Sequence, residues 1–177
     1  MDVRIETDRL ILRVPALVDL DEWSTMMQDE ETAKFIGGAV PREVSWRALM
    51  TLIGSWHALG FAMFSVIEKS SGRWVGRLGP WQPEGWPGTE IGWAIARDCW
   101  GKGYATEGAI AATDWAFDTL GWTEMIHSIA PENVASQAVA MKLGSINRGR
   151  GSLPAPYENS IIDIWGQTRE QWRARRT

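Results

Sequence analysis

Residues 89–120 place the tightest constraint on the fold of this 177-residue chain. The stretch "TEIGWAIA" at its start has the length and apolar content of a buried strand. Gly101 and Gly103 follow, and over residues 105–120 the apolar side chains recur on one helical face. The segment therefore predicts a strand, a glycine loop and then a helix whose N-terminus lacks an ordinary capping side chain.

A glycine loop that leads into a helix is a candidate anion site. Glycine permits backbone conformations and close approaches that a side chain would forbid. The first turn of a helix offers free N–H groups and a partial positive charge. Together these properties suit a phosphate group, so the loop is tested against known phosphate motifs and against a purely structural glycine turn.

Two common phosphate motifs fit this loop poorly. A P-loop needs Lys and then Ser or Thr after its second glycine, but Ala109 and Ile110 follow Gly108. The dinucleotide fingerprint needs a third glycine where Thr106 stands, and it opens its domain, whereas about a hundred residues precede this loop. The P-loop interpretation fails, the dinucleotide interpretation is disfavoured, and a structural turn stays open for the segment taken alone.

The rest of the chain predicts a mixed α/β fold with about seven strands. Strands are expected at 9–14, as a pair within 61–79, and at 89–96, 122–130, 145–151 and 157–167. Helices are expected within 19–38, 42–60, 105–120, 132–144 and 169–177. No repeat, low-complexity tract or linker divides the chain, so residues 1–177 are interpreted as a single domain.

Composition argues against several classes of function. Cys99 is the single cysteine, which rules out an internal disulfide, and His57 and His127 are the two histidines, so no metal-ligand spacing exists. The formal net charge of −4 argues against nucleic acid, which needs clustered basic residues. No apolar run approaches the roughly 20 residues of a membrane span, and charges occupy the start of the chain where a signal peptide is apolar. We therefore expect a cytoplasmic protein with no metal, no nucleic-acid partner and no membrane partner.

The sequence contains 12 tryptophans against 2 tyrosines. Most of these rings are expected in the core and on sheet faces. Trp81 and Trp86 stand in a Pro- and Gly-rich stretch, "GPWQPEGWPG", and are candidates to present apolar surface to a substrate or a second subunit. Local packing is the alternative for this pair, and a homodimer is one of the expectations.

Four ordered motifs resemble the GNAT superfamily of acyl-CoA-dependent N-acetyltransferases. The similarity is to the branch of RimJ and RimL, the ribosomal-protein N-terminal acetyltransferases. "WGKGYATEG" resembles the family's pyrophosphate loop, Gln/Arg-x-x-Gly-x-Gly/Ala, with Trp100 in place of Gln or Arg, as is often seen in that branch. "ETDRLILR", "EIGWAIA" and "NVASQAVAMKLG" resemble its opening strand, its fourth strand and its Asn-x-x-Ser segment. Ser145 departs from the aromatic residue that usually follows the last glycine.

This resemblance implies a GNAT fold, in which a mostly antiparallel twisted sheet splays between its fourth and fifth strands and is flanked by helices. It implies acetyl-CoA as co-substrate and no metal. The pantetheine arm would pair with unpaired main-chain groups of Ile95 and Ala96 and meet Asn133. Backbone N–H groups would bind the pyrophosphate, and Thr106 would add a hydroxyl. The predicted contacts of the loop are Trp100, Gly101, Lys102, Gly103, Tyr104, Ala105 and Thr106.

Acetyl transfer to an amine needs a base, a donor to the developing oxyanion and an acid for the departing thiolate. Glu90 is the predicted base, with an edge residue in a polar turn as its alternative role. Ser136 is the predicted acid and a coenzyme contact, and its alternative role is to cap the short helix. The alternative role of Asn133 is to satisfy the turn before that helix. The oxyanion donor would be a main-chain N–H near Ile95. His127 is more simply explained as a hydrogen-bonded core residue.

The resulting hypothesis is acetyl-CoA-dependent N-acetyltransfer, by direct attack of a primary amine on the thioester in a ternary complex. The resemblance favours the α-amine of a protein or peptide N-terminus as acceptor. An α-amine, with a pKa of about 7.7–8.0, needs a weaker base than a lysine near about 10.4. An antibiotic-like or polyamine small molecule is the first alternative acceptor. A non-catalytic module that binds acyl-CoA is the alternative from another class.

Overall fold

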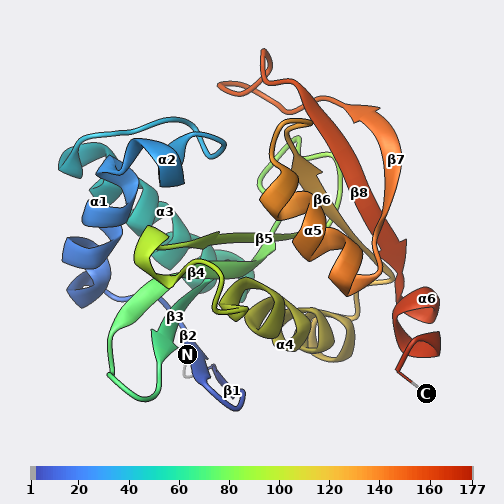
Figure 1. The fold of residues 1–177 in the computed structure, drawn as a ribbon, viewed down its shortest axis with the longest axis horizontal. Coiled ribbons are helices and arrows are strands. Elements are labelled where there is room, and N and C mark those ends of the chain that lie inside the picture. Colours follow the sequence, from blue (N-terminus) through green and yellow to red (C-terminus); the bar gives the residue numbers. More distant parts are fainter. Residues whose placement is uncertain (1–2, 177) are drawn as a thin grey trace.

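The computed structural model describes residues 3–176 (Figure 1). Its strands are β1 (Arg4–Glu6), β2 (Leu10–Arg13), β3 (Phe64–Glu68), β4 (Trp74–Trp81), β5 (Glu90–Ile95), β6 (Glu124–Ile129), β7 (Ile146–Gly151) and β8 (Ile162–Thr168). Its α-helices are α1 (Leu20–Gln28), α2 (Glu30–Ala33), α3 (Arg42–Leu59), α4 (Tyr104–Thr119), α5 (Val134–Leu143) and α6 (Arg169–Ala174). The ends of the predicted domain, residues 1 and 177, lie outside the described residues.

Within the described residues, eight strands form one sheet in the order β1-β2-β3-β4-β5-β6-β8-β7. Neighbouring strands are antiparallel, except that β5 and β6 are parallel. This arrangement confirms the mixed, mostly antiparallel sheet. The strand absent from the prediction is β1, which pairs with β2 at the edge of the sheet. The predicted fourth and fifth strands are therefore β5 and β6.

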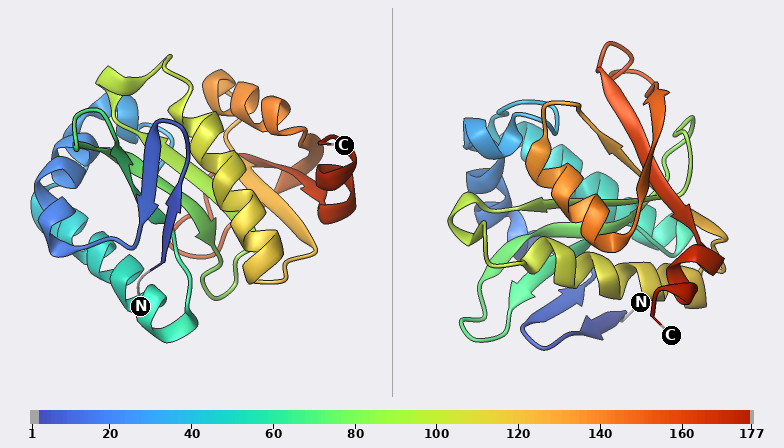
Figure 2. Two further views of the ribbon diagram at one scale, coloured as in Figure 1. Left: turned by 90° about the horizontal axis from the view of Figure 1, so that it is seen from below. Right: turned by 45° about the vertical axis from the view of Figure 1, so that its right-hand side comes forward.

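Helices cover both faces of the sheet (Figures 1 and 2). One face of β4 and β5 is covered by α4, while α1 contacts β4 from the other side and packs against α3. The approach of α4 to the sheet depends on Gly108, because a Cβ there would lie 2.4 Å from Cδ2 of Leu78 on β4. A methyl group at this position would overlap the Leu78 side chain, so the close packing requires glycine.

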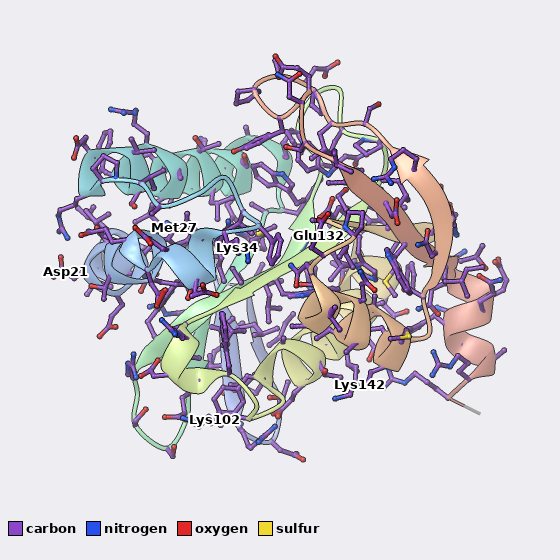
Figure 3. The ribbon with its side chains drawn as sticks, turned by 45° about the horizontal axis from the view of Figure 1, so that its top comes forward. Asp21, Met27, Lys34, Lys102, Glu132 and Lys142 are labelled. Carbon is purple, nitrogen blue, oxygen red and sulfur yellow. The ribbon has the colours of Figure 1, made fainter. Side chains whose placement is uncertain are left out.

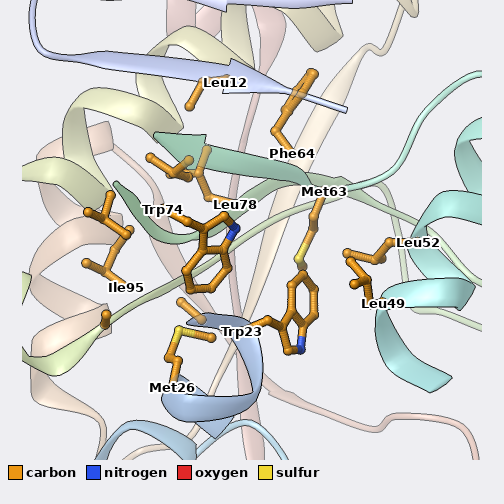
Figure 4. Packing of buried hydrophobic residues seen from close by; sticks show 14 of the residues in the cluster. Leu12, Trp23, Met26, Leu49, Leu52, Met63, Phe64, Trp74, Leu78 and Ile95 are labelled. Carbon is orange, nitrogen blue, oxygen red and sulfur yellow. The ribbon is translucent and has the colours of Figure 1, made fainter. Parts of the chain in front are cut away.

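The larger hydrophobic cluster extends over both faces of the sheet, against α1 and α3 on one side and α4 on the other. Figure 4 shows Trp23 of α1 and Met63 packed together, with Leu49 and Leu52 of α3 beside them. The Trp23 ring also lies 5.8 Å from the ring of Trp74 on β4. Large aromatic rings dominate this core because each buries a great deal of apolar area. Most of the tryptophans are therefore structural, as expected.

The two central strands separate after a single paired position, where Glu90 of β5 faces Ile126 of β6. Along its other edge, β6 pairs continuously with β8 from Glu124 to Ile129. The later part of β5 consequently has no strand partner on that side. The predicted splay between these strands is confirmed, and it opens the sheet at its centre.

Candidate active site

The loop before α4 has the backbone that the sequence predicted. Gly101 has a φ of +75° and Gly103 a φ of +83°, both in the left-handed region that favours glycine. Gly103 is the N-cap residue of α4, and no side chain accepts a hydrogen bond from the first turn. The N–H groups of Tyr104, Ala105 and Thr106 thus belong to a helix start without a side-chain cap. This geometry fits an anion such as a pyrophosphate.

Arg9, on the turn between β1 and β2, anchors this loop and was not among the predicted site residues. Its Nη1 donates to the carbonyl of Lys102 at 2.9 Å, and its Nε donates to Glu107 at 2.7 Å. Burial raises the pKa of Glu107, but hydrogen bonds from Thr7 and Arg9 outweigh it and leave that pKa lowered. The ionised carboxylate on α4 and the loop carbonyl are therefore held by one guanidinium. The motif "ETDRLILR" contains Arg9, but its partners lie about ninety or more residues away.

Two predicted loop residues direct their side chains toward β3 instead of outward. The Tyr104 hydroxyl donates to Glu68, and the Lys102 ammonium lies 3.9 Å from the same carboxylate and 5.7 Å from the Tyr104 ring. Figure 3 shows Lys102 beside the start of α4. The contribution of these two residues to an anion site therefore rests on their main-chain groups, and the Lys102 charge adds to the local field.

The structure corrects the prediction for Ile95 and Ala96. The N–H of Ala96 donates to the carbonyl of Val75 on the β4 side at 2.9 Å, so the prediction that it is unpaired is wrong. The carbonyl of Ile95 accepts the Trp100 indole N–H at 2.7 Å, so it is not free either. Because main-chain groups alternate between the two edges of a strand, those of Trp93 and Ile95 face the open side. The main-chain N–H of Ile95 lies on that edge and remains the predicted hydrogen-bond donor to the oxyanion.

Asn133 and Ser136 meet at the start of α5, on the open side of the sheet. Asn133 is the N-cap residue, and its side-chain oxygen accepts the N–H of Ser136 at 3.0 Å. The cap is thus Asn133, and the alternative role of Ser136 as the cap is wrong. The Ser136 hydroxyl accepts the Trp93 indole N–H at 3.2 Å, which leaves its own proton to donate elsewhere. Both side chains line the cavity described next.

A cavity of about 470 Å³ lies where β5 and β6 separate, and residues from both faces of the sheet line it. Trp93, which pairs with Leu78, belongs to the face covered by α4. Glu90, which pairs with Trp81, belongs to the opposite face. Side chains of both kinds line the same space, so the cavity passes through the sheet. Such an opening lets a molecule held on one face reach a molecule held on the other.

Glu90 lies buried in the wall of this cavity, 7% exposed. Burial raises the pKa of its carboxyl, against hydrogen bonds from Trp86 and Ser128 and the charge of Arg77, which lower it. The Trp86 indole and the Ser128 hydroxyl both donate to Oε2, at 2.6 and 2.8 Å. The predicted base is therefore fixed in place by two neighbours, and its pKa is shifted toward neutrality, as a general base requires.

His127 faces away from Glu90 and is fully engaged in the fold. Its Nδ1–H donates to the carbonyl of Ile91 at 2.7 Å, so its Nε2 accepts the hydroxyl of Ser145 at 2.9 Å. Burial lowers the pKa of His127 to about 4, although the hydrogen bond to Ile91 opposes it. The imidazole is neutral at physiological pH and acts as a hydrogen-bonded core residue. Ser145, the departure from the family pattern, is its partner.

The tryptophan pair of the Pro- and Gly-rich stretch lies at the cavity. Trp81 and Trp86 stand edge to face with ring centroids 6.5 Å apart, and Trp86 does the same with Tyr157 at 6.4 Å. All three rings line the cavity. The rings therefore pack locally against one another and also give the cavity wall a large apolar contact area.

Residues 3–176 hold no group of three or more His, Cys, Asp or Glu side chains placed to bind a metal ion. Within the same residues no helix combines the length and the apolar character that crossing a membrane requires.

Comparison with known proteins places the chain in a family. The acetyltransferase (GNAT) domain family matches residues 9–146. The uncharacterized N-acetyltransferase p20 of Bacillus licheniformis is 29% identical over 165 residues, covering 90% of this chain and 91% of that protein. A crystal structure of an acetyltransferase from Agrobacterium tumefaciens superimposes with a TM-score of 0.82 at 25% identity, covering 93% of this chain and 94% of that one.

The RimJ protein of Mycobacterium smegmatis, solved in complex with CoA-disulfide, shares the fold. Its TM-score is 0.72 at 20% identity, over 92% of this chain and 83% of that one. This likeness concerns the fold, and it agrees with the resemblance read from the motifs. The family match, the sheet that splays at β5 and β6 and the uncapped start of α4 lead to one conclusion. The chain belongs to the GNAT acetyltransferase family and is an acyltransferase.

Proposed function

We propose that this protein transfers the acetyl group of acetyl-CoA to a primary α-amine by direct attack of the amine on the thioester. The observation that carries the proposal is the cavity through the sheet, with Glu90 in its wall on one face and Ser136 on the other. The uncapped start of α4 lies beyond the end of β5, the strand that carries Glu90. The complex of RimJ with CoA-disulfide supports coenzyme binding by this fold.

The residues of the chain fit the coenzyme. The main-chain N–H groups from Gly101 to Thr106 would bind the pyrophosphate, with Arg9 holding the loop in shape. The N–H of Ile95 and the side chain of Asn133 would position the pantetheine arm along the open edge of β5. When bound, acetyl-CoA supplies an acyl group activated as a thioester. The protein would supply the proton transfers, the orientation of the reactants and, from a main-chain N–H near Ile95, a hydrogen bond to the developing oxyanion.

Glu90 would accept the proton that the attacking amine loses. Its Oε2 is held by Trp86 and Ser128, which fixes the orientation of the carboxylate at the cavity wall. A carboxyl with a raised pKa is matched to an α-amine, whose pKa of about 7.7–8.0 leaves a large neutral fraction at physiological pH. Ser136 would donate its hydroxyl proton toward the departing sulfur, oriented by the indole of Trp93.

Release of free thiol from acetyl-CoA tests this function directly. The acceptor panel contains peptides with free and with blocked N-termini, lysine side-chain amines, polyamines and aminoglycosides. Thiol release that requires a free α-amine supports the proposal. Faster thiol release with a polyamine or an aminoglycoside would identify a small-molecule amine, instead of a peptide α-amine, as the acceptor. Tight binding of acetyl-CoA in calorimetry without turnover on any amine would establish the non-catalytic binding module instead.

The coenzyme loop has a test of its own in Gly103→Asp. An aspartate at the N-cap position would accept the same N–H groups that the phosphate needs and would repel the anion. We expect the Kd for acetyl-CoA to rise at least tenfold, about 1.4 kcal/mol. Gly121→Asp is the matched control, because Gly121 has a similar φ of +71° and open space at the other end of α4. Equal affinity in both variants would remove the loop from the site.

A cytoplasmic location and a homodimer remain predictions from the sequence. Cell fractionation tests the first, and sedimentation of the purified protein tests the second.

A further inference from the structure

Arg77 is the cationic side chain of the cavity wall that the acyl-transfer reaction does not use. It lies on β4 four residues before Trp81, which pairs with Glu90, so Arg77 and Glu90 share one face of the sheet. Both side chains line the cavity. Among residues 3–176 no carboxylate lies within ion-pair distance of Arg77, whereas Arg73, just before β4, is paired with Asp98.

The contacts of Arg77 hold its guanidinium without satisfying it. Its Nη1 donates to the thioether sulfur of Met63 at 2.8 Å, and its Cζ lies 5.3 Å from the centre of the Trp23 ring. Its Nε is buried and has no hydrogen-bond partner. A thioether is a weak acceptor, and the face of an indole attracts a cation without accepting a directed hydrogen bond. Figure 4 shows Trp23 and Met63 packed together. Both of these side chains contact the Arg77 guanidinium.

A buried guanidinium without a carboxylate is costly unless something else pairs with it. Burial lowers the pKa of Arg77, while Tyr157 and Glu90 raise it, and an arginine stays charged throughout the physiological range. Glu90 does not supply the missing partner, because within residues 3–176 no ion pair joins it to Arg77, and its Oε2 accepts from Trp86 and Ser128. The Arg77 residue as a whole is partly exposed although its Nε is buried, and both Arg77 and Tyr157 line the cavity.

Met63 links the surroundings of Arg77 and Glu90 in the cavity wall. A Cβ on Gly92 would lie 2.5 Å from the Met63 methyl and 3.5 Å from Oε1 of Glu90. Met63 therefore contacts Arg77 through its sulfur and approaches the Glu90 carboxylate through its methyl. Arg77 and Glu90, a cation and an anion that both approach Met63, complement the charges of a molecule that carries a carboxylate and an ammonium group.

Resting on the proposed function, we propose that the acceptor carries a carboxylate near its amine, and that Arg77 binds this carboxylate while the amine approaches Glu90. The planar fork of a guanidinium matches the two oxygens of a carboxylate in a bidentate pair. Arg77 thereby becomes a determinant of acceptor specificity. Two sources of the carboxylate share this chemistry: a free α-amino acid, and a peptide whose first residue is Asp or Glu.

The test compares acceptors that differ only in the carboxylate. Peptides beginning with Asp or Glu are paired with peptides beginning with Asn or Gln, and free amino acids are paired with their α-amides. For the wild type we expect kcat/KM at least tenfold higher for the carboxylate member of one set. A higher value among the peptides identifies the acidic N-terminus, and a higher value among the free compounds identifies the amino acid. Equal values within both sets would overturn the proposal.

Arg77→Met assigns that preference to the guanidinium. We expect KM for the carboxylate acceptor to rise at least tenfold, and kcat/KM for the neutral member to stay within about twofold, while acetyl-CoA affinity is unchanged. Arg77→Lys should restore part of the preference, because it keeps the charge but loses the fork. Arg73→Met, which removes a paired surface arginine from the same strand region, is the control and should change neither acceptor. Equal losses on both acceptors in Arg77→Met would overturn the assignment.

Calorimetry separates this proposal from the proposed function. The probes are the N-acetylated Asp and Asn peptides and the N-acetylated free amino acid with its amide, so no turnover is needed. Tighter binding of the carboxylate member, lost in Arg77→Met but not in Arg73→Met, supports the inference even in a protein that acetylates nothing. Acetyl transfer without any such difference would keep the function and reject the role of Arg77. Thermal unfolding of each variant shows whether it is folded.

Discussion

His127 and Glu90 are buried titratable side chains on opposite faces of the central strands, and their hydrogen bonding differs. His127 is satisfied on both nitrogens, by Ile91 and Ser145, and its lowered pKa keeps it neutral. Glu90 is held through one oxygen and lines the cavity, and its pKa is raised. Burial shifts the two pKa values in opposite directions because it disfavours the charged form of each group. Both side chains line the cavity, but both ring nitrogens of His127 are engaged within the fold, whereas Glu90 is held through Oε2.

Glu90→Gln separates the chemical role of this carboxyl from its effect on stability. The variant should lower kcat/KM about a hundredfold, the usual contribution of a general base. It should also raise the free energy of unfolding at neutral pH, because burial disfavours the ionised carboxylate in the folded protein relative to the unfolded chain, and the amide has no such penalty.

The pH dependence of that stability gain follows from the raised pKa. Below the unfolded-state pKa of 4.5 the carboxyl is protonated in both states, so the gain should vanish. As the pH rises through the higher folded-state pKa, the gain should grow to its full value. Urea unfolding across this range measures it. Glu84→Gln, an exposed carboxyl at the cavity rim, is the control. A gain that is independent of pH would show that the pKa of Glu90 is the same in the folded and unfolded states.

His127 should make the protein less stable as the pH falls. The unfolded chain binds a proton near pH 6.5, whereas the folded protein binds it near pH 4. The free energy of unfolding should therefore decrease through this window, by roughly 3 kcal/mol at most. The measurement is urea unfolding in the Glu90→Gln background, which removes the opposing titration. His127→Gln should flatten the pH dependence in that background, and an unchanged slope would assign the acid sensitivity to another group.

At the scale of elements, α4 is positioned by contacts at its start and along its length. Arg9 holds the loop carbonyl of Lys102 and the carboxylate of Glu107 in the first turns. Gly108, one residue further, lets the helix lie directly against Leu78 of β4. The helix start that faces the coenzyme is thus fixed by the packing of its first turns on the sheet. These contacts therefore fix the position of the start of α4 relative to the open edge of β5.

Gly108→Ala tests the close approach of α4 to the sheet. The added methyl would lie 2.4 Å from Leu78, so the helix or the leucine must shift, and we expect a loss of about 1–3 kcal/mol in stability. Gly54→Ala is the matched control, since Gly54 lies inside α3 with nothing within 4 Å of a Cβ. That change should stabilise the protein by about 0.5–1 kcal/mol. Denaturant unfolding measures both, and equal effects of the same sign would contradict the packing argument.

For the whole molecule, the separation of β5 from β6 is the organising feature. Two hydrophobic clusters meet at this point, one around Trp23 and Trp56 and one around Phe117 and Trp172. β5 and α4 contribute side chains to both clusters, whereas β6 contributes to the second. The molecule is therefore held together across its central opening by one strand and one helix, and the coenzyme would lie between them and β6.

Hydrogen exchange should show this arrangement when acetyl-CoA is added. The N–H groups of residues 103–106 have no helical partner, so a bound pyrophosphate should slow their exchange, by up to about a hundredfold at a ligand concentration about 100 times Kd. The exposed strand β7 should be unaffected. Mass spectrometry of peptides from both regions measures the difference. Protection spread evenly over the molecule, or confined to β7 and β8, would place the coenzyme elsewhere.

The sequence predicted those parts of the protein that depend on neighbouring residues. The strand at Glu90, the left-handed glycines at Gly101 and Gly103 and the helix behind them are local in cause, since periodicity and backbone freedom act over a few residues. The ordered motifs then predicted the family and its splayed sheet, which the fold confirms. The assignment of Glu90 as the base and of the loop as the phosphate site remain predictions.

The tertiary structure decided which of these groups meet and which are already occupied. It pairs Ala96 with Val75 and the Ile95 carbonyl with the Trp100 indole, against the expectation of free groups. It brings Arg9 to Glu107 and leaves Arg77 against a sulfur and an indole inside the cavity. Such contacts join positions far apart in the chain, and the charge and hydrogen-bond balance of a buried group depends on every element around it. A local pattern carries no information about those partners, so the fold alone settles them.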